Sequence, residues 1–114
     1  MPLNELIEGV SARVTGSIVN ALTGVAFEPT TLVFSIYDRA SGDVINSRDE
    51  TALTPATDCP GGALAHTLVA ADMAMASATA TVETHVLRYK WTYNAGADVG
   101  IAEMQFRVLK DQSP

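Results

Sequence analysis

The chain has 114 residues, a formal net charge of −6 and a hydrophobic fraction of 47%. This length corresponds to one domain and is enough to build a hydrophobic core. An acidic chain with only seven lysine and arginine residues is a poor candidate for binding nucleic acid or an anionic membrane, because both need clustered positive charge. We therefore expect neither as a partner.

The start of the sequence and its cysteine content indicate the cellular compartment in which the protein is expected to reside. No apolar run approaches the ~20 residues that span a bilayer, and the acidic start M-P-L-N-E-L-I-E-G lacks the basic segment of a secretory signal. The single cysteine, Cys59, excludes an internal disulfide. These features predict a protein that is made and kept in a reducing cytoplasm.

We expect an N-terminal arm over residues 1–9, one domain over residues 10–109 and a C-terminal tail over residues 110–114. The arm either packs on a neighbouring subunit or remains a frayed terminus. Within the domain, alternation of apolar and polar residues predicts strands, because successive side chains of a strand point to opposite faces. The expected strands are 10–18, 31–37, a short return at 44–45, 63–69, a stretch that starts near 79 and runs through 86–93, and 102–108. Within an otherwise loop-like stretch, residues 51–53 are a candidate for a further short strand.

Residues 86–108 hold the centre of the expected core, since they include the only tryptophan and two of the three tyrosines. One face of this stretch is apolar, and we expect it to point inward. Its members are Leu87, Tyr89, Trp91 and Tyr93, followed after a loop by Ala102, Met104, Phe106 and Val108.

The Ala-rich segment 70–77 favours a short helix, because alanine and methionine are good helix formers. The rest of the chain predicts about seven short strands joined by turn-rich loops. We therefore predict an all-β fold with a single antiparallel β-sandwich. Antiparallel sheets of this kind expose edge strands that can pair with another chain.

No motif in the sequence indicates a catalytic, cofactor-binding or metal site. The turn from Asp38 to Asp43 has too few carboxylates for calcium and carries an arginine, so turn capping explains it better. His66 and His85 lack the spacing of a zinc motif, and Cys59 has no neighbour that would activate it. We predict that the chain is not an enzyme.

The aromatic stripe Tyr89, Trp91 and Tyr93 has two interpretations. An exposed stripe on a strand can form a sugar-binding platform. We prefer a core role, because the chain has few other large aromatic residues to fill its interior.

Three stretches of the sequence carry a resemblance to a known family. They are E-P-T-T-L-V-F-S-I-Y-D at 28–38, R-Y-K-W-T-Y-N-A-G at 88–96 and A-E-M-Q-F-R-V at 102–108. Together they resemble the small immunoglobulin-like β-sandwich proteins encoded among the head and tail genes of tailed bacteriophages. The resemblance covers residues 10–108 and concerns mostly core and turn residues. The Ala-rich segment departs from it, because a shorter turn with glycine is expected there.

The resemblance implies an immunoglobulin-like fold and a structural virion protein: a capsid decoration protein, or a neck, connector or tail component. Its partners would be major capsid, portal or tail subunits, met in many copies in a symmetric assembly within the host bacterial cytoplasm. It carries over no catalytic residue, cofactor or metal. The alternative is an immunoglobulin-like module that binds a carbohydrate or a host surface. The residues we expect to contact partners are Leu3, Leu6 and Ile7 of the arm, and Met73 and Met75.

Overall fold

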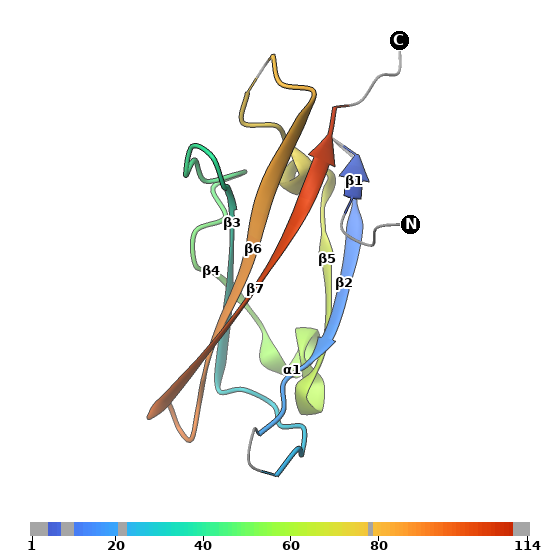
Figure 1. Cartoon of the computed structure of the whole chain (residues 1–114). Coiled ribbons are helices and arrows are strands. Elements are labelled where there is room, and N and C mark those ends of the chain that lie inside the picture. Colours follow the sequence, from blue (N-terminus) through green and yellow to red (C-terminus); the bar gives the residue numbers. More distant parts are fainter. Residues whose placement is uncertain (1–4, 8–10, 21–22, 78, 111–114) are drawn as a thin grey trace.

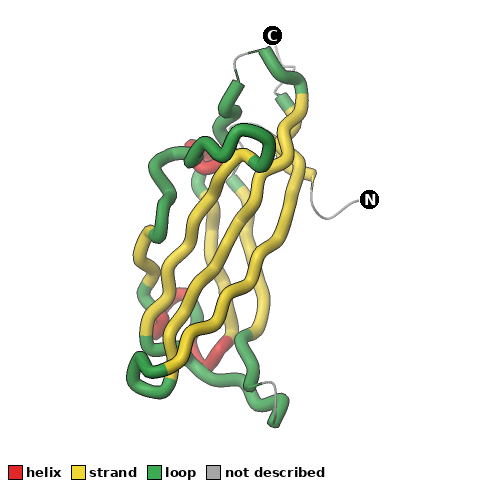
Figure 2. The backbone as a smooth tube through the Cα atoms, turned by 60° about the vertical axis from the view of Figure 1, so that its left-hand side comes forward, coloured by secondary structure: helices red, strands yellow, loops and turns green. Residues whose placement is uncertain are grey.

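The computed structural model describes residues 5–7, 11–20, 23–77 and 79–110, and of residues 5–7 the backbone alone. The fold is almost entirely β, with short helical turns in the loops (Figures 1 and 2). The elements in chain order are β1 (Glu5–Ile7), β2 (Ala12–Ser17), β3 (Thr31–Asp38), β4 (Thr51–Leu53), α1 (Pro55–Asp58), the 3-10 turn η1 (Pro60–Gly62), β5 (Ala63–Leu68), the 3-10 turn η2 (Ala70–Met73), β6 (Val82–Tyr93) and β7 (Asp98–Leu109).

The strands form two sheets. The larger has the order β1-β7-β6-β3-β4, and the smaller consists of β2 and β5. All neighbours pair antiparallel except β1, which runs parallel to the end of β7. Figure 1 shows the smaller sheet lying alongside one face of the larger. The predicted all-β fold is confirmed, with the correction that its pairing is not antiparallel throughout.

A shared hydrophobic core lies between the two sheets. Phe34, Ile36 and Leu87 contribute to it from the larger sheet, and Leu68 from the smaller. The alternation predicted for residues 31–37 is confirmed, because every second residue of β3 from Leu32 onward is buried. Each of these side chains removes apolar surface from water, which is the main stabilising contribution to such a fold.

Two predicted elements are wrong in detail. Residues 44–45 do not form a strand, since Val44 makes only an isolated bridge to Tyr37. The predicted helix over 70–77 is limited to η2, and the chain becomes extended at Ala74. The reason lies in β6, where the Glu83 carboxylate accepts the N–H groups of residues 76 and 77. A helix would need those same donors for its own carbonyl groups.

The inward face predicted for residues 102–108 is correct only in part. Phe106 and Val108 are buried, but Ala102 and Met104 are exposed. All four lie on the same face of β7, opposite alternate residues of β6. In the part of the chain that the structure describes, the smaller sheet consists of two strands, and it leaves Ala102 and Met104 on the first half of this face exposed.

Candidate functional site

One edge of the larger sheet is open along most of β7. This strand pairs with β6 over its whole length in one continuous register, without a bulge. On its other side β1 covers only Arg107, Val108 and Leu109. Residues 98–106 therefore have no strand neighbour on that side within the described chain. Their backbone N–H and C=O groups that point outward can pair with another strand.

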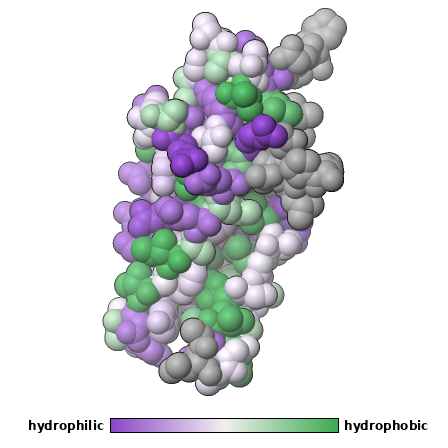
Figure 3. Space-filling model, in the orientation of Figure 1, coloured by the Kyte–Doolittle hydropathy of each residue, from purple (hydrophilic) through white to green (hydrophobic). Residues whose placement is uncertain are grey.

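Apolar side chains are exposed on both faces of this open edge. Val99 is 53% exposed and Ile101 51% on the outer face, and Met104 is 46% exposed on the inner face. Figure 3 shows hydrophobic residues reaching the surface in the lower half of the view. Natural edge strands are protected by lysine and other charged side chains, by proline or by a bulge. Residues 98–106 have no lysine, proline or bulge, and their charged side chains are Asp98 and Glu103. The edge therefore carries few of the features that prevent pairing with another strand.

An apolar cleft of about 150 Å³ adjoins the inner face of this edge. It opens between β2, which pairs only with β5 in the described chain, and β7. A space of this size and apolar character is on the scale of cavities that hold a benzene-sized group. Among the described residues that line the cleft, Glu103 is the only charged one. The apolar side chains that line it are Val14, Ile18, Leu32, Leu64, Tyr89, Trp91, Ala102 and Met104.

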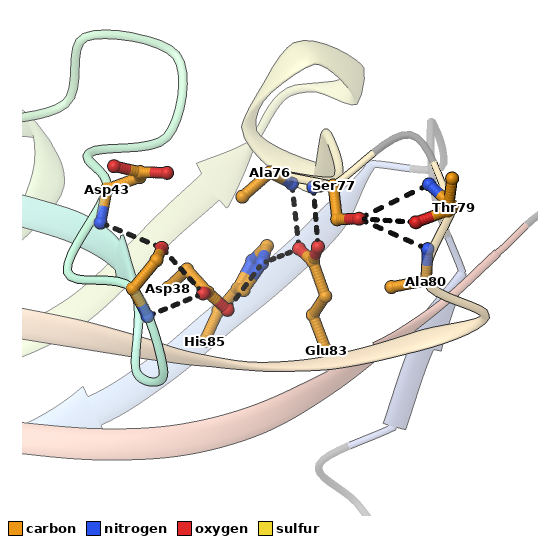
Figure 4. A network of polar contacts seen from close by, with 9 residues as sticks. Asp38, Asp43, Ala76, Ser77, Thr79, Ala80, Glu83 and His85 are labelled. Carbon is orange, nitrogen blue, oxygen red and sulfur yellow. Dashed lines mark hydrogen bonds and ion pairs between the residues drawn. The ribbon is translucent and has the colours of Figure 1, made fainter.

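A polar cluster lies at the opposite end of β6. His85 Nε2 is 2.8 Å from Glu83 Oε1 and 3.9 Å from Asp38 Oδ1, and all three side chains are buried (Figure 4). Their three ligand atoms lie within 4.8 Å of one another, the spacing of a metal-binding set. Their existing hydrogen bonds, however, show another use.

The Glu83 carboxylate fastens the loop before β6. Its two oxygens accept the N–H groups of Ala76 and Ser77 at 2.7 Å each, and one also bonds to His85. Burial by itself would raise the pKa of Glu83, but these hydrogen bonds lower it below its ordinary value. Asp38 in turn holds the backbone N–H and hydroxyl of Ser41. The cluster therefore acts as a structural clamp on two loops.

The contacts of the His85 ring fit this role. Its Nε2 lies at hydrogen-bond distance from the Glu83 carboxylate, which places a proton on Nε2. Its Nδ1 has no partner among the described residues.

A second clamp joins two loops around Asp72. Its carboxylate accepts hydrogen bonds from Arg48 Nε at 2.7 Å, Asn46 Nδ2 at 2.8 Å and the backbone N–H of Val69 at 2.9 Å. Burial by itself would raise the pKa of Asp72, but these donors lower it below its ordinary value. The guanidinium of Arg48 also lies 5.2 Å from the ring of Phe34.

The structure separates the residues predicted to contact partners. Leu3 lies outside the described residues, and Leu6 and Ile7 belong to β1, whose backbone pairs with the end of β7. Met73 is fully buried in the core, so its side chain offers no surface to a partner. Met75 is partly buried against the same core. The structure does not bring these residues together into one site.

Two further residues singled out in the sequence belong to the interior. Cys59 is buried, and burial raises the pKa of its thiol, which disfavours the reactive thiolate. His66 forms a 2.9 Å hydrogen bond with the hydroxyl of Tyr89 and contacts the ring of Phe34. Tyr89 is therefore a core residue with a satisfied hydroxyl group.

Sequence reasoning missed the open part of β7, although a signal was present. Ala102 occupies an inward position where a buried strand would carry a larger side chain, whereas Gly100 leaves room for the ring of Trp91 on β6. The small side chain of Ala102 was therefore the signal that the opposing layer does not fill the space there. Comparison with protein-family models, curated proteins and solved structures finds no match. None of the helices in the described parts of the chain has the length and apolar character to cross a membrane.

Proposed function

We propose that this chain is a non-enzymatic structural protein that acts through protein–protein contacts. The observation that carries the proposal is the open edge of β7, residues 98–106, with exposed apolar side chains and an adjoining apolar cleft. Strand addition at such an edge combines backbone hydrogen bonds with side-chain pockets, and is a common mode of protein recognition. The polar clusters support a non-catalytic role, because their carboxylates are engaged in holding loops.

We propose further that the protein is a component of a tailed-phage virion, either a capsid decoration protein or part of the head-to-tail neck or connector. Support for this step comes from the sequence resemblance of residues 28–38, 88–96 and 102–108, which contribute to β3, β6 and β7. An immunoglobulin-like arrangement of the sheets belongs to the same proposal. The partners would be capsid, portal or tail subunits, present in many copies and assembled in the host cytoplasm.

A carbohydrate-binding module is the second candidate, and one observation favours it. Phe27, Trp91 and Tyr93 are partly exposed and line a hollow of about 380 Å³ together with Asn94 and Asp98. Aromatic rings and planar polar groups are the residue types that suit a sugar. Two facts weigh against an open platform, since Tyr89 is buried and the rings of Phe27 and Tyr93 pack on each other at 5.2 Å.

The first experiment is mass spectrometry of purified particles of the phage that encodes the chain. A structural role predicts the protein in particles at a stoichiometry set by their symmetry. Its absence from particles would refute the virion role.

A matched pair of variants then tests the surface. Ile101→Glu places a charge on the open edge, opposite Lys90 of the same chain, and is therefore compatible with the fold. Val25→Glu places the same charge at a residue that is 64% exposed in the turn between β2 and β3, outside the β7 edge. We expect only the first to reduce incorporation into particles. Retention on a glycan array, lost in Trp91→Ala, would favour the carbohydrate module instead.

A further inference from the structure

The open edge of β7 is complementary to a second copy of itself. The unpaired segment runs from residue 98 to residue 106, and its midpoint is Ala102. Two such segments can pair antiparallel about a two-fold axis at that residue, which makes the interface isologous. We propose that the chain forms a symmetric dimer in which the β7 edges pair about Ala102 and join the two larger sheets into one. This inference rests on the proposed function and names one partner of the surface that carries it.

The side chains of the inner face are complementary in size in this register. Ala102 lies opposite the Ala102 of the second copy, and Met104 lies opposite Gly100. A Cβ atom on Gly100 would come within 2.3 Å of the ring of Trp91, so that ring already lies across Gly100. The exposed Met104 of each copy would therefore reach the ring of Trp91 in the other copy. Contacts between methionine sulfur and aromatic rings are favourable.

The apolar cleft supports the same arrangement. In an antiparallel pair the two-fold axis is perpendicular to the sheet, so both inner faces lie on the same side. The cleft of each copy opens at the β7 side of the molecule, between β2 and β7. The two clefts would then face each other across the axis, and exposed apolar surface would be removed from water on both sides.

The charges around the edge also permit self-association, although the chain as a whole has a net charge of −6. Across β6 and β7 the carboxylate of Glu103 lies 3.9 Å from Arg88, and Lys90 lies opposite Ile101. On the outer face of the dimer, Ile101 would lie opposite Glu103 of the second copy, so no two like charges would be directly opposed. Added salt should strengthen the dimer, because it screens the net repulsion between copies.

The register makes a test with opposite charges possible. Ile101→Glu would place two carboxylates opposite each other at both symmetric positions, which destabilises a strand pair. Ile101→Lys would place an ammonium group opposite Glu103 of the second copy. The lysine variant carries the less favourable charge within its own chain, because its neighbour on β6 is Lys90. A general folding defect would therefore affect Ile101→Lys more than Ile101→Glu. The proposed dimer predicts instead that Ile101→Glu loses dimerisation more than Ile101→Lys.

The experiment is sedimentation equilibrium of the intact chain over a wide concentration range, with the fluorescence of Trp91, the only tryptophan, recorded on the same samples. We expect a monomer–dimer equilibrium, with emission shifting to the blue as Trp91 becomes buried. Ile101→Glu should raise the dissociation constant at least tenfold, while Ile101→Lys and Val25→Glu should retain the dimer. Circular dichroism checks that each variant is folded.

Three results would overturn the inference: a monomer up to the solubility limit, equal dimerisation of the glutamate and lysine variants, or loss in the lysine variant alone. A monomer in solution that is nevertheless found in particles would refute the dimer and leave the virion proposal standing. A protein that dimerises in solution but is absent from particles would refute the virion proposal and leave the dimer standing.

Discussion

Removal of the Asp72 carboxylate tests how the loops at one end of the fold are held. Asp72 is 1% exposed and joins η2 to the loop that carries Asn46 and Arg48. That loop contains Asn46, Ser47 and Glu50 at positive φ angles of 53°, 56° and 48°. Such conformations cost of order 1 kcal/mol or more each outside glycine. The bonds to Asp72 help to offset this strain.

We expect Asp72→Ala to lower the free energy of unfolding by about 3 kcal/mol. Loss of one partner from a buried ion pair costs about 3–5 kcal/mol, because the other charge remains buried. The Arg48 side chain keeps 28% of its surface exposed, so water can partly solvate its charge after the substitution. This places the expected loss at the lower end of the range. It is still a large part of a total stability of about 5–15 kcal/mol.

Urea unfolding followed by Trp91 fluorescence measures this loss, and its pH dependence tests the cause. Because the pKa of Asp72 is lowered on folding, its contribution is present above the ordinary carboxyl pKa of about 4. The contribution is lost as the pH falls through the folded pKa, so the difference between the two proteins should narrow in acid. Asp49→Ala, an exposed neighbour, should change stability by less than about 0.5 kcal/mol. A loss below about 1 kcal/mol for Asp72→Ala, or a difference that does not change with pH, would refute the reasoning.

Three further predictions concern other clusters. Glu83→Gln should cost about 2 kcal/mol, because it replaces one of the two accepting oxygens by an NH2 group that cannot accept the backbone N–H now bonded there. Hydrogen exchange at the amides of Ala76 and Ser77 should become faster. Unchanged protection would contradict the clamp. Burial lowers the pKa of His66, so the free energy of unfolding should fall as the pH drops below 6.5. In His66→Phe the urea concentration at the unfolding midpoint should therefore change less between about pH 8 and pH 5 than in the unmodified protein. Gly62→Ala should cost at least about 2 kcal/mol, since its φ is +90° and a Cβ would lie 2.6 Å from a backbone carbonyl oxygen. Gly24→Ala, with a φ of +71° and open space, should cost about 1 kcal/mol, and equal losses would show that the close contact does not matter.

The strands that alternate most clearly were predictable from the sequence. β3 and β6 lie at the centre of the larger sheet and have neighbours on both sides. Their inward side chains, such as Phe34 and Leu87, are large and apolar. The alternation of these residues along the sequence is enough to identify the buried face of each strand. The turn at residues 38–43 was predictable for the same reason, since it depends on residues close together in the sequence. Asp38 caps this turn by accepting the N–H of Ser41.

The helical segment shows why a local preference was not sufficient. Alanine and methionine favour a helix over 70–77, yet only η2 forms. Two of the backbone donors that a longer helix would need are taken by Glu83, which follows in β6. A contact of this kind depends on where β6 lies in space, and a propensity scale does not contain that information.

The candidate site could be predicted only in outline. The sequence indicates that a sandwich has edge strands, but not which of them remains open. Met73 and Met104 are the same residue type, and interpretation from the sequence favoured Met73 as a surface contact. The structure buries Met73 and leaves Met104 46% exposed.

The sequence by itself therefore determined the all-β class, the central strands with their inward faces, and the acidic character of the chain. These properties depend on residue type and on near neighbours along the chain. Only the tertiary structure decided that β1 covers the last three residues of β7 and that, among the described residues, two strands form the opposing layer and no strand pairs with the outer side of residues 98–106. The physical reason is that burial of a strand face requires another element across it. Which element lies there is set by contacts between residues far apart in the chain.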